Sequence, residues 1–418
     1  MRSIREDPER ARAALARRGA AGDLDELLRL DARRRELLPR VEELRARQNA
    51  ASQAIAEAKR SGGDAEELIA EMREVASEAK GLGAELAEVE AARDDVAAKL
   101  PNLPHPGAPD GGEDDSVVLR EAGERPDFGF EPRDHLDLAQ KHGWIEMEKA
   151  AEASGARFAY LLGDLVMVEL ALIRFAVERV RAEGFEPVVP PVLVREGPLY
   201  GTGMFPGERE MIYEVERDEL FLIGTSEVSL AALHAGDILG AGELPRRYAG
   251  ISTCFRREAG AAGRDTRGIF RVHQFDKVEM FSFVDPSGSE AEHERILAIE
   301  EGIMGALELP YRVVDIPVGD LGAPAARKFD VEAWIPSQER YRELTSCSNT
   351  TDYQARRLDA RFRRVPDTSP EPVHTLNGTA VAVGRTLIAL LENGQRKDGT
   401  VALPQALVDA GAPPVIPA

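Results

Sequence analysis

The N-terminal quarter of the chain carries two long runs of mostly apolar residues that recur at alternating steps of four and three. The first run is Leu37, Val41, Leu44, Gln48, Ala51, Ile55 and Ala58. The second run is Leu68, Met72, Val75, Ala79, Leu82, Leu86, Val89, Arg93, Val96 and Leu100. This heptad spacing keeps one stripe of each helix facing a partner helix. Between the runs, Ser61-Gly62-Gly63-Asp64 supplies a stop, a turn and a cap, so we expect an antiparallel helical hairpin.

Such a hairpin would be a narrow arm and not a globular domain. About 35 residues per helix, rising about 1.5 Å each, span roughly 50 Å. An arm of this kind reaches for a partner or serves as a dimerisation or spacer coiled coil, and periodicity alone favours the coiled coil. Pro39 interrupts the first run. Because proline inside a helix costs about 3 kcal/mol, we predict a bend or a helix start near Leu38.

Charge is unevenly distributed along the chain. The net charge of −21 by itself argues for a small-molecule enzyme, because affinity for nucleic-acid phosphates comes mainly from Lys and Arg. Residues 27–60, however, contain nine basic and five acidic residues, whereas residues 64–100 contain four basic and eleven acidic ones. The cations of the first segment either bind a nucleic acid or are ordinary solvated helix positions; they include Arg33, Arg34, Arg35, Arg45 and Arg47.

Proline and glycine crowd residues 101–112, which indicates a linker. Beyond it we expect helices near 164–183 and 290–307, and strands near 185–194, 210–223, 311–318, 328–333 and 340–349. This mixture predicts an α+β fold built on an antiparallel sheet, and the chain has no Rossmann or Walker A glycine loop. We predict an N-terminal domain over residues 1–100, a linker over 101–133 and a second domain over 134–418.

The segment from Ile251 to Phe281 carries the most chemistry. Two alternating runs flank an Arg-bearing loop rich in Gly and Ala at 259–268, which predicts an antiparallel hairpin whose side chains alternate between two faces. One face carries charged and aromatic residues, namely Arg256 and Glu258 on the first strand and Arg271, Phe275 and Glu279 on the second. The other face is apolar, with Phe270, Val272, Val278 and Met280. Because buried charges need partners, the charged face is either the floor of a polar pocket or an exposed, solvated surface.

A polar pocket of this composition suits the activation of a carboxylate by a nucleotide. The planar guanidinium of Arg256 could hold a carboxylate and an α-phosphate together and stabilise the charge that develops between them. Phe275 offers a stacking platform for a purine. Glu279 could bind a substrate hydroxyl or amine.

The segment resembles motif 2 of the class II aminoacyl-tRNA synthetases, and within them that of the bacterial-type seryl-tRNA synthetases. Four further segments resemble the same family in the same order along the chain. Residues 184–191 are similar to motif 1, residues 222–227 to the serine-site loop, residues 342–349 to the metal-site strand and residues 377–385 to motif 3. The resemblance implies a class II catalytic domain that activates L-serine with ATP and transfers it, through seryl-adenylate, to the 3′ end of serine tRNA.

The resemblance also implies roles for individual residues. Arg256 and Arg385 are expected to be catalytic, and Glu343 and Ser346 to ligate Mg²⁺. The expected serine site is Thr225, Glu227, Arg256, Glu279 and Thr379. The expected ATP site is Arg256, Arg257, Glu258, Arg271, Val272, Phe275, Glu343, Leu344, Thr345, Ser346 and Arg385.

Some of these positions have ordinary structural explanations as well. Thr225 and Glu227 fit a helix cap equally well. A lone Glu343 on a strand is more often a surface residue, so its metal role depends on the resemblance. A solvated Arg385 is disfavoured, because a cation near a helix N-terminus opposes the helix dipole. His273 is expected to be a structural neighbour, since no general base is required.

The resemblance further implies that the arm grips the long variable arm of serine tRNA, that the chain forms a homodimer through motif 1 near Pro191, and that the loop with Arg264 and Arg267 guides the tRNA acceptor end. Whether a selenocysteine tRNA is also charged stays open. Two rival functions remain. A related ligase for another amino acid or acceptor would lack the arm, and a non-catalytic scaffold would have no need of Arg256, Glu279, Glu343 and Arg385 together.

We expect a cytoplasmic protein without membrane spans. The most apolar stretch, residues 160–177, is interrupted by Asp164, Glu169 and Arg174, and the N-terminus lacks the apolar region of a signal peptide. Cys254 and Cys347 are the only cysteines and lack zinc-ligand spacing, so reduced structural thiols are expected.

Overall fold

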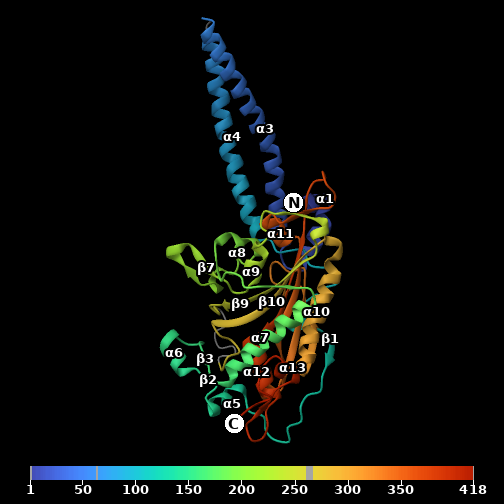
Figure 1. Cartoon of the computed structure of the whole chain (residues 1–418). Helices are drawn as coiled ribbons and strands as arrows, with labels where there is room; N and C mark the ends of the chain where they lie inside the picture. Colours follow the sequence, from blue (N-terminus) through green and yellow to red (C-terminus); the bar gives the residue numbers. More distant parts are fainter. Residues whose placement is uncertain (1, 63–64, 260–266, 418) are drawn as a thin grey trace. The chain divides into compact units, whose positions relative to one another are not determined.

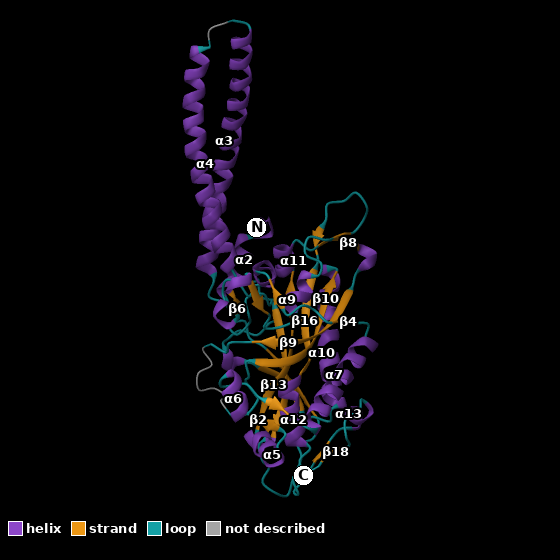
Figure 2. Cartoon of the chain, turned by 60° about the vertical axis from the view of Figure 1, so that its left-hand side comes forward, coloured by secondary structure: helices purple, strands orange, loops and turns teal. Residues whose placement is uncertain are grey.

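The computed structural model describes residues 2–62, 65–259 and 267–417, which form two compact units, Met1–Leu103 and Pro104–Ala418. The first unit is helical and consists of α1 (Arg2–Glu6), α2 (Pro8–Ala16), α3 (Ala21–Arg60) and α4 (Glu66–Lys99). In Figures 1 and 2, α3 and α4 form a long two-helix hairpin, as the heptads predict. Of the predicted turn residues, Gly63 and Asp64 lie outside the described part of the chain.

The heptad seam is buried between α3 and α4. Leu37 and Val41 are fully buried, Leu86 is nearly so, and the other seam residues are at least half-buried. α3 runs unbroken through Pro39, so the predicted helix start near Leu38 is wrong. The buried contacts of Leu37 and Val41 on either side of the proline keep this part of α3 packed against α4.

Acidic residues of α4 neutralise part of the basic stretch on α3. Three inter-helix ion pairs have N–O distances of 2.8 to 3.0 Å, namely Arg33–Glu85, Arg34–Glu90 and Arg47–Glu71. Arg45 and Lys59, by contrast, are exposed and make no ion pair within the described residues. These two cations therefore stay available to an outside partner.

The second unit is built on an eight-stranded sheet in the order β1-β11-β12-β13-β16-β10-β9-β4, in which only β4 and β9 are parallel neighbours. Its strands are β1 (Val117–Ala122), β4 (Glu186–Val188), β9 (Arg246–Phe255), β10 (Gln274–Val284), β11 (Tyr311–Asp315), β12 (Arg327–Ile335), β13 (Arg340–Thr351) and β16 (His374–Ala382). β1 lies within the segment expected to be a linker and forms an edge of the sheet by pairing with β11.

Three helices, α7 (Asp164–Ala182), α10 (Ser289–Ala306) and α12 (Val383–Asn393), pack on the sheet (Figure 1). Val278 and Met280 of β10 join them in the largest core. The opposite side of β10 carries Phe281 and Phe283, which pack in a second core with α9 (Glu227–Ala232) and α11 (Tyr353–Leu358). The two faces of β10 therefore follow the predicted alternation.

The remaining elements are short. The helices are α5 (His135–His142), α6 (Glu148–Ser154), α8 (Glu196–Thr202) and α13 (Gln405–Asp409). The strands are β2 (Ile145–Glu146), β3 (Tyr160–Leu161), β5 (Leu193–Val194), β6 (Glu214–Val215), β7 (Leu220–Leu222), β8 (Ile238–Gly240), β14 (Arg361–Arg363), β15 (Glu371–Pro372), β17 (Val401–Ala402) and β18 (Val415–Ile416). Among the helices of the described residues, none has the length and apolar character needed to cross a bilayer.

Two further sequence expectations fail in detail. The run 185–194 is divided between β4 and β5, which belong to different sheets. The second strand of the charged hairpin begins at Gln274 and not at Phe270, so Arg271 and Val272 precede it. The chain departs from the strand there because Gly268 has a φ of +69° and the next two residues, Ile269 and Phe270, turn into the main core.

Candidate active site

A cavity of about 300 Å³ lies on the charged face of the sheet. The first half of β10, the middle of β13 and β16, the first turn of α12 and Arg256, directly after β9, all contribute to its lining. Every residue expected in the serine, ATP or metal site lines this cavity, with the single exception of Arg257. Arg257 is directed away from the cavity, because its guanidinium carbon lies 5.8 Å from the ring centre of Tyr213.

Arg256 follows directly after β9 and lies over the cavity floor. Its Nε donates to the carbonyl oxygen of Gly224 at 3.1 Å, and its guanidinium carbon is 5.3 Å from the ring centre of Phe275. Within the described residues, no hydrogen bond or ion pair uses its two terminal nitrogens. These contacts hold the planar fork in place and leave its two-pronged edge free for an anionic ligand.

Glu279 and Thr379 lie directly opposite each other on β10 and β16. Glu279 is 2 % exposed and Thr379 is 7 % exposed, so both line a corner of the cavity that is almost inaccessible to solvent. The hydroxyl of Thr225 donates to a carboxylate oxygen of Glu279 at 3.0 Å. A hydroxyl acceptor and a hydroxyl donor thus face the same small space, which suits a ligand with a short hydroxyl side chain.

Lys277 is part of this corner, although the sequence analysis did not select it. Its ammonium group forms an ion pair with Glu279 and donates to the Thr225 hydroxyl oxygen at 2.7 Å. Burial lowers the pKa of Lys277 to about 8. Period-two alternation places residue 277 on the same face as Phe275 and Glu279, so the signal that could have identified it was present in the sequence.

Glu227 begins α9 and is buried, so of the two interpretations of Thr225 and Glu227, an extended segment or the start of a helix, the helix is the one found. The Thr225 hydroxyl accepts the backbone N–H of Glu227 at 3.3 Å, whereas the N-cap residue Ser226 makes no side-chain capping bond. The Glu227 carboxylate accepts from the amides of Gln354 at 2.6 Å and Asn377 at 2.7 Å. Burial raises the pKa of Glu227, and the two amides partly offset that effect.

A β-bulge in β13 shapes the opposite wall of the cavity. The pairing with β12 shifts between Val331 and Glu332, so that Leu344 is the extra residue between Thr345 and Glu343. A bulge re-aims side chains, which explains how Glu343 and Ser346, an odd number of residues apart, both line the cavity. Thr345 itself is buried, and its hydroxyl lies 3.3 Å from a carboxylate oxygen of Glu300 on α10.

Glu343 and Arg385 form the charged rim of this wall. Arg385 is the third residue of α12, and its Nη1 lies 3.1 Å from the Glu343 carboxylate and 3.0 Å from the Glu343 carbonyl oxygen. Burial alone would raise the pKa of Glu343, but the cations Lys328 and Arg385 outweigh it and lower the pKa to about 2. Glu343 therefore stays anionic, and its side chain is 39 % exposed.

Aromatic rings complete the cavity beside these cations. Phe270 lies beneath two guanidinium groups, with the carbon of Arg342 at 4.0 Å and that of Arg385 at 5.0 Å from its ring centre. Phe275 lies under Arg256 on the cavity floor. Cations stacked on aromatic faces are held in fixed orientations. The side chains that would contact a flat ligand are therefore already oriented before it binds.

Arg271 and Glu258 pair with each other at 3.2 Å beside the cavity. His273 is bound to the backbone, with Nδ1 2.8 Å from the carbonyl oxygen of Arg256, so it is placed as a structural neighbour. Arg264 lies outside the described residues. Arg267 contacts two carboxylates, with its Nε 2.6 Å from Asp134 and its Nη2 bound to Asp137, and this pairing is not the free position expected of a tRNA contact.

The antiparallel sheet, the free arginine fork and the absence of a glycine-rich nucleotide loop define the core of a class II aminoacyl-tRNA synthetase. Residues 212–394 match the family model described as the tRNA synthetase class II core domain (G, H, P, S and T). Residues 1–104 match the model of the seryl-tRNA synthetase N-terminal domain.

Whole-chain relatives narrow the class to one family. The chain is 50 % identical to a serine–tRNA ligase of Acidothermus cellulolyticus, over 98 % of this chain and 97 % of that protein. A seryl-tRNA synthetase structure from Pyrococcus horikoshii, complexed with ATP, has a TM-score of 0.91 and 41 % identity and covers 99 % of this chain and 98 % of its own. A cytoplasmic serine–tRNA ligase from Naegleria fowleri, in complex with AMP, has a TM-score of 0.86 and 33 % identity over 98 % of this chain and 95 % of its own. The chain belongs to the seryl-tRNA synthetase family.

Proposed function

We propose that the cavity joins serine to ATP and that the activated serine then passes to tRNA. In the first step, a carboxylate oxygen of serine attacks the α-phosphorus of ATP, the bond from that phosphorus to the bridging β-phosphate oxygen breaks, and pyrophosphate leaves. In the second step, a ribose hydroxyl at the 3′ end of the tRNA attacks the serine carbonyl carbon and AMP leaves. No protein nucleophile is needed, because positioning and charge stabilisation lower both barriers.

The observation that carries this proposal is the free fork of Arg256. One edge of its guanidinium is fixed by Gly224 and Phe275, and the other edge meets the cavity between the Glu279 corner and the Glu343 wall. The fork can bind the attacking carboxylate and the α-phosphate together. Charge on both groups changes as the new bond forms, so a fixed cation at this point favours the transition state over the separate reactants.

Serine is selected at the Glu279 corner. The side-chain hydroxyl of serine can donate to Glu279 and accept from Thr379, and alanine would leave both of these buried groups without a partner. Lys277 neutralises Glu279 and orients Thr225. Glu227 adds a negative potential toward the substrate ammonium group.

ATP occupies the remainder of the cavity. The adenine ring stacks between Phe275 and Arg385, and the α-phosphate meets Arg256. Arg271, held by Glu258, supplies a second cation for the phosphates. Arg385 holds the γ-phosphate end while it keeps its contacts with Glu343.

Glu343 and Ser346 would hold Mg²⁺ on the phosphates. The described residues contain no cluster of three His, Cys, Asp or Glu side chains, so the protein alone does not build a cage for a metal. This donor set fits Mg²⁺, which takes one carboxylate and keeps waters and phosphate oxygens as its other ligands. Glu343, whose pKa is lowered by the neighbouring cations Lys328 and Arg385, can serve as that carboxylate. When bound, the ion would offset the charge of the departing pyrophosphate.

The acceptor is serine tRNA, which we assign to the arm, with Arg45 and Lys59 as the exposed cations that meet its phosphates. An aminoacylation assay with selenocysteine tRNA as the acceptor decides whether that tRNA is a second substrate. We also propose a homodimer through the region of Pro191 and, because tRNA charging takes place where proteins are made, a cytoplasmic location.

The test is pyrophosphate exchange into ATP with each of the twenty amino acids, on the wild-type chain and on a matched pair of variants. We expect exchange to be strongest with serine. Arg256→Lys should lower kcat/KM for exchange about a hundredfold or more, because a point charge does not replace a two-pronged contact. Arg257→Lys, one residue outside the cavity lining, should have little effect. Strongest exchange with another amino acid, or equal loss in both variants, would refute the proposal.

A further inference from the structure

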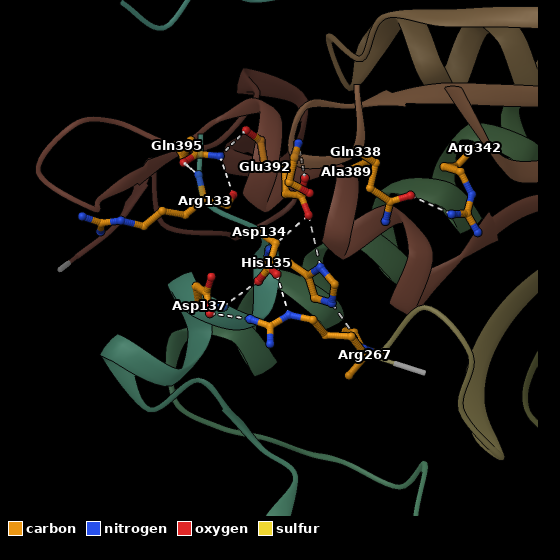
Figure 3. A network of polar contacts seen from close by, with 12 residues as sticks. Arg133, Asp134, His135, Asp137, Arg267, Gln338, Arg342, Ala389, Glu392 and Gln395 are labelled. Atoms are coloured by element: carbon orange, nitrogen blue, oxygen red, sulfur yellow. Dashed lines mark hydrogen bonds and ion pairs between the residues drawn. The ribbon is translucent and has the colours of Figure 1, made fainter. Parts of the chain in front are cut away.

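Three consecutive residues, Arg267, Gly268 and Ile269, lie against the start of α5. Figure 3 shows Arg267 beside Asp134 and Asp137, with His135 between this pair and Glu392. The backbone N–H of Ile269 donates to Nε2 of His135 at 3.3 Å. Gly268 passes so close that a side-chain carbon at its α-position would lie 2.0 Å from the same nitrogen. Arg267 pairs with Asp134 and Asp137, which precede and follow His135. The chain is therefore fixed at the point where it re-enters the cavity lining.

His135 is in turn held by α12. Its Nδ1 lies 3.1 Å from a carboxylate oxygen of Glu392, and its backbone N–H donates to the same oxygen at 3.0 Å. The second oxygen of Glu392 accepts the backbone N–H of Ser337 at 3.1 Å. His135 is 4 % exposed and Glu392 is fully buried, so these bonds are made without competition from water. The imidazole must carry its proton on Nδ1, because Nε2 accepts from Ile269.

These contacts are part of a closed series of interactions in the cavity wall. Ile269 and Phe270 are consecutive, and Phe270 supplies the ring beneath Arg385. Arg385 and Glu392 lie seven residues apart on α12, which is two helical turns, so they share one side of the helix. The wall therefore contains a closed path from Glu392 through His135 to Ile269 and Phe270, and back through Arg385 to α12.

We propose that His135 is a positioning residue for the nucleotide end of the cavity: its contacts with Ile269 and Glu392 keep Phe270 at the distance from α12 at which it holds Arg385. This inference rests on the proposed role of Arg385 at ATP. His135 itself does not line the cavity and is not expected to contact a substrate. Among the described residues, no hydrogen bond or ion pair joins Glu279 or Thr379 to this path, so serine binding should be largely independent of it.

The experiment measures KM for ATP and KM for serine separately, by pyrophosphate exchange, in the full chain. His135→Phe keeps a ring of similar size but loses both ring hydrogen bonds. We expect KM for ATP to rise about fivefold to tenfold, because the variant loses a buried hydrogen bond and displaces the ring that holds the cation of Arg385. KM for serine should change less than about twofold. His135→Gln, whose amide oxygen can accept from Ile269, should restore most of the affinity for ATP.

The matched control is His142→Phe, in the same helix. His142 packs beside Trp144 with ring centres 4.6 Å apart, and among the described residues it makes no hydrogen bond or ion pair with Ile269 or Glu392. This variant should leave both KM values unchanged. If it raises KM for ATP as much as His135→Phe does, the effect belongs to the packing of α5 and the proposal is wrong.

A double variant provides the second measurement. Phe270→Leu should itself raise KM for ATP, and adding His135→Phe to it should raise KM little further, because both changes interrupt one path. Independent, multiplying effects would overturn the inference, as would equal rises of KM for ATP and serine or no change in either. Wild-type exchange without any preference for serine would instead overturn the proposed function, so the two failures can be told apart.

Discussion

Ser226 lies between two expected serine-site residues, and its hydroxyl is buried without a hydrogen-bond partner in the part of the chain that the structure describes. The side chain packs against Gly250 of β9, where an added Cβ would lie 2.8 Å from the Ser226 oxygen. A buried hydroxyl that makes no hydrogen bond costs stability, so Ser226→Ala should raise the free energy of unfolding by about 1 kcal/mol. Urea unfolding followed by the fluorescence of Trp144 and Trp334, the only two tryptophans, measures this value.

Ser229, one turn further along α9, is the matched control. Its hydroxyl donates to the carbonyl oxygen of Pro191 at 2.7 Å. Ser229→Ala should therefore lower the free energy of unfolding by about 1 kcal/mol, the opposite sign from Ser226→Ala. Two changes of the same sign would contradict the hydrogen-bond explanation.

His293 gives the second unit a dependence of stability on pH. Burial lowers the pKa of His293 to about 4, and the ring lies 4.8 Å from the ring of Phe329 with Nε2 3.2 Å from the Cys347 carbonyl oxygen. Because the folded pKa is below the unfolded one, the unfolded state binds more protons between pH 6.5 and 4. The free energy of unfolding should fall by up to about 3 kcal/mol as the pH drops through this window.

The variant His293→Gln can still donate to Cys347 but does not titrate. Its unfolding free energy should depend on pH less steeply than that of the wild type between pH 6.5 and 4, in urea unfolding at several pH values. His105→Gln is the control, because His105 is partly exposed and bound to Glu290 at 3.1 Å. Parallel curves for the wild type and His293→Gln would show that other groups cause the loss.

At the level of whole elements, strongly periodic sequence patterns predicted the structure correctly. Local changes in the backbone could not be predicted from them. The heptads predicted the α3–α4 hairpin, and alternation predicted the core side of β10, because both patterns repeat over many residues. The helix start at Leu38 was wrong because packing on both sides of Pro39 outweighed a local cost. Alternation also placed Lys277 on the cavity side of β10, but only the structure drew attention to it.

The bulge at Leu344 shows why part of the cavity needed the structure. Neither the composition nor the spacing of residues 342–349 indicates that β13 slips by one residue against β12. Without the slip, Glu343 and Ser346 would lie on opposite faces of the strand. Their joint place in the site came from family resemblance and not from periodicity. The anchorage of Ile269 by His135 was likewise invisible, since the two residues are 134 positions apart.

The arm makes a prediction at the same scale. Four arginines of α3, namely Arg33, Arg34, Arg40 and Arg47, are paired with α4. Arg45 and Lys59 are exposed and without ion pairs among the described residues. If they meet tRNA phosphates, the double change Arg45→Glu and Lys59→Glu should raise KM for tRNA in serine charging about tenfold or more. Serine-dependent pyrophosphate exchange, which needs no tRNA, should be unchanged.

The control reverses a charge outside the arm. Lys149→Glu on α6 makes the same change at an exposed residue that pairs with Glu152 at 3.0 Å. It should leave KM for tRNA unchanged. The effect of the arm variant should also shrink at high salt, because phosphate contacts release counterions. Loss of exchange together with charging would mean that the arm does not act as a separate recognition element.

For the molecule as a whole, exposed apolar side chains support the proposed homodimer. Val189 is 81 % exposed two residues before Pro191, and Met167 and Leu170 are about half exposed, one turn apart on α7, which packs against β4. A second copy would remove these side chains from water, at roughly 25 cal/mol for each Å². The double change Val189→Asp and Leu170→Glu would place charges in that contact, and it should give a monomer by light scattering at micromolar concentration.

A matched change separates assembly from general damage to the surface. Val365, in a loop, is 57 % exposed, and Val365→Asp adds the same kind of charge away from α7 and β4. It should remain a dimer. Activity then shows whether the cavity depends on assembly. β4 pairs with β9, which ends at Phe255 directly before Arg256, so loss of the partner should loosen the strand next to the free fork. Exchange should therefore fall with the dimer in the first variant and persist in the second. A monomeric wild type, or a first variant that stays dimeric, would place the contact elsewhere.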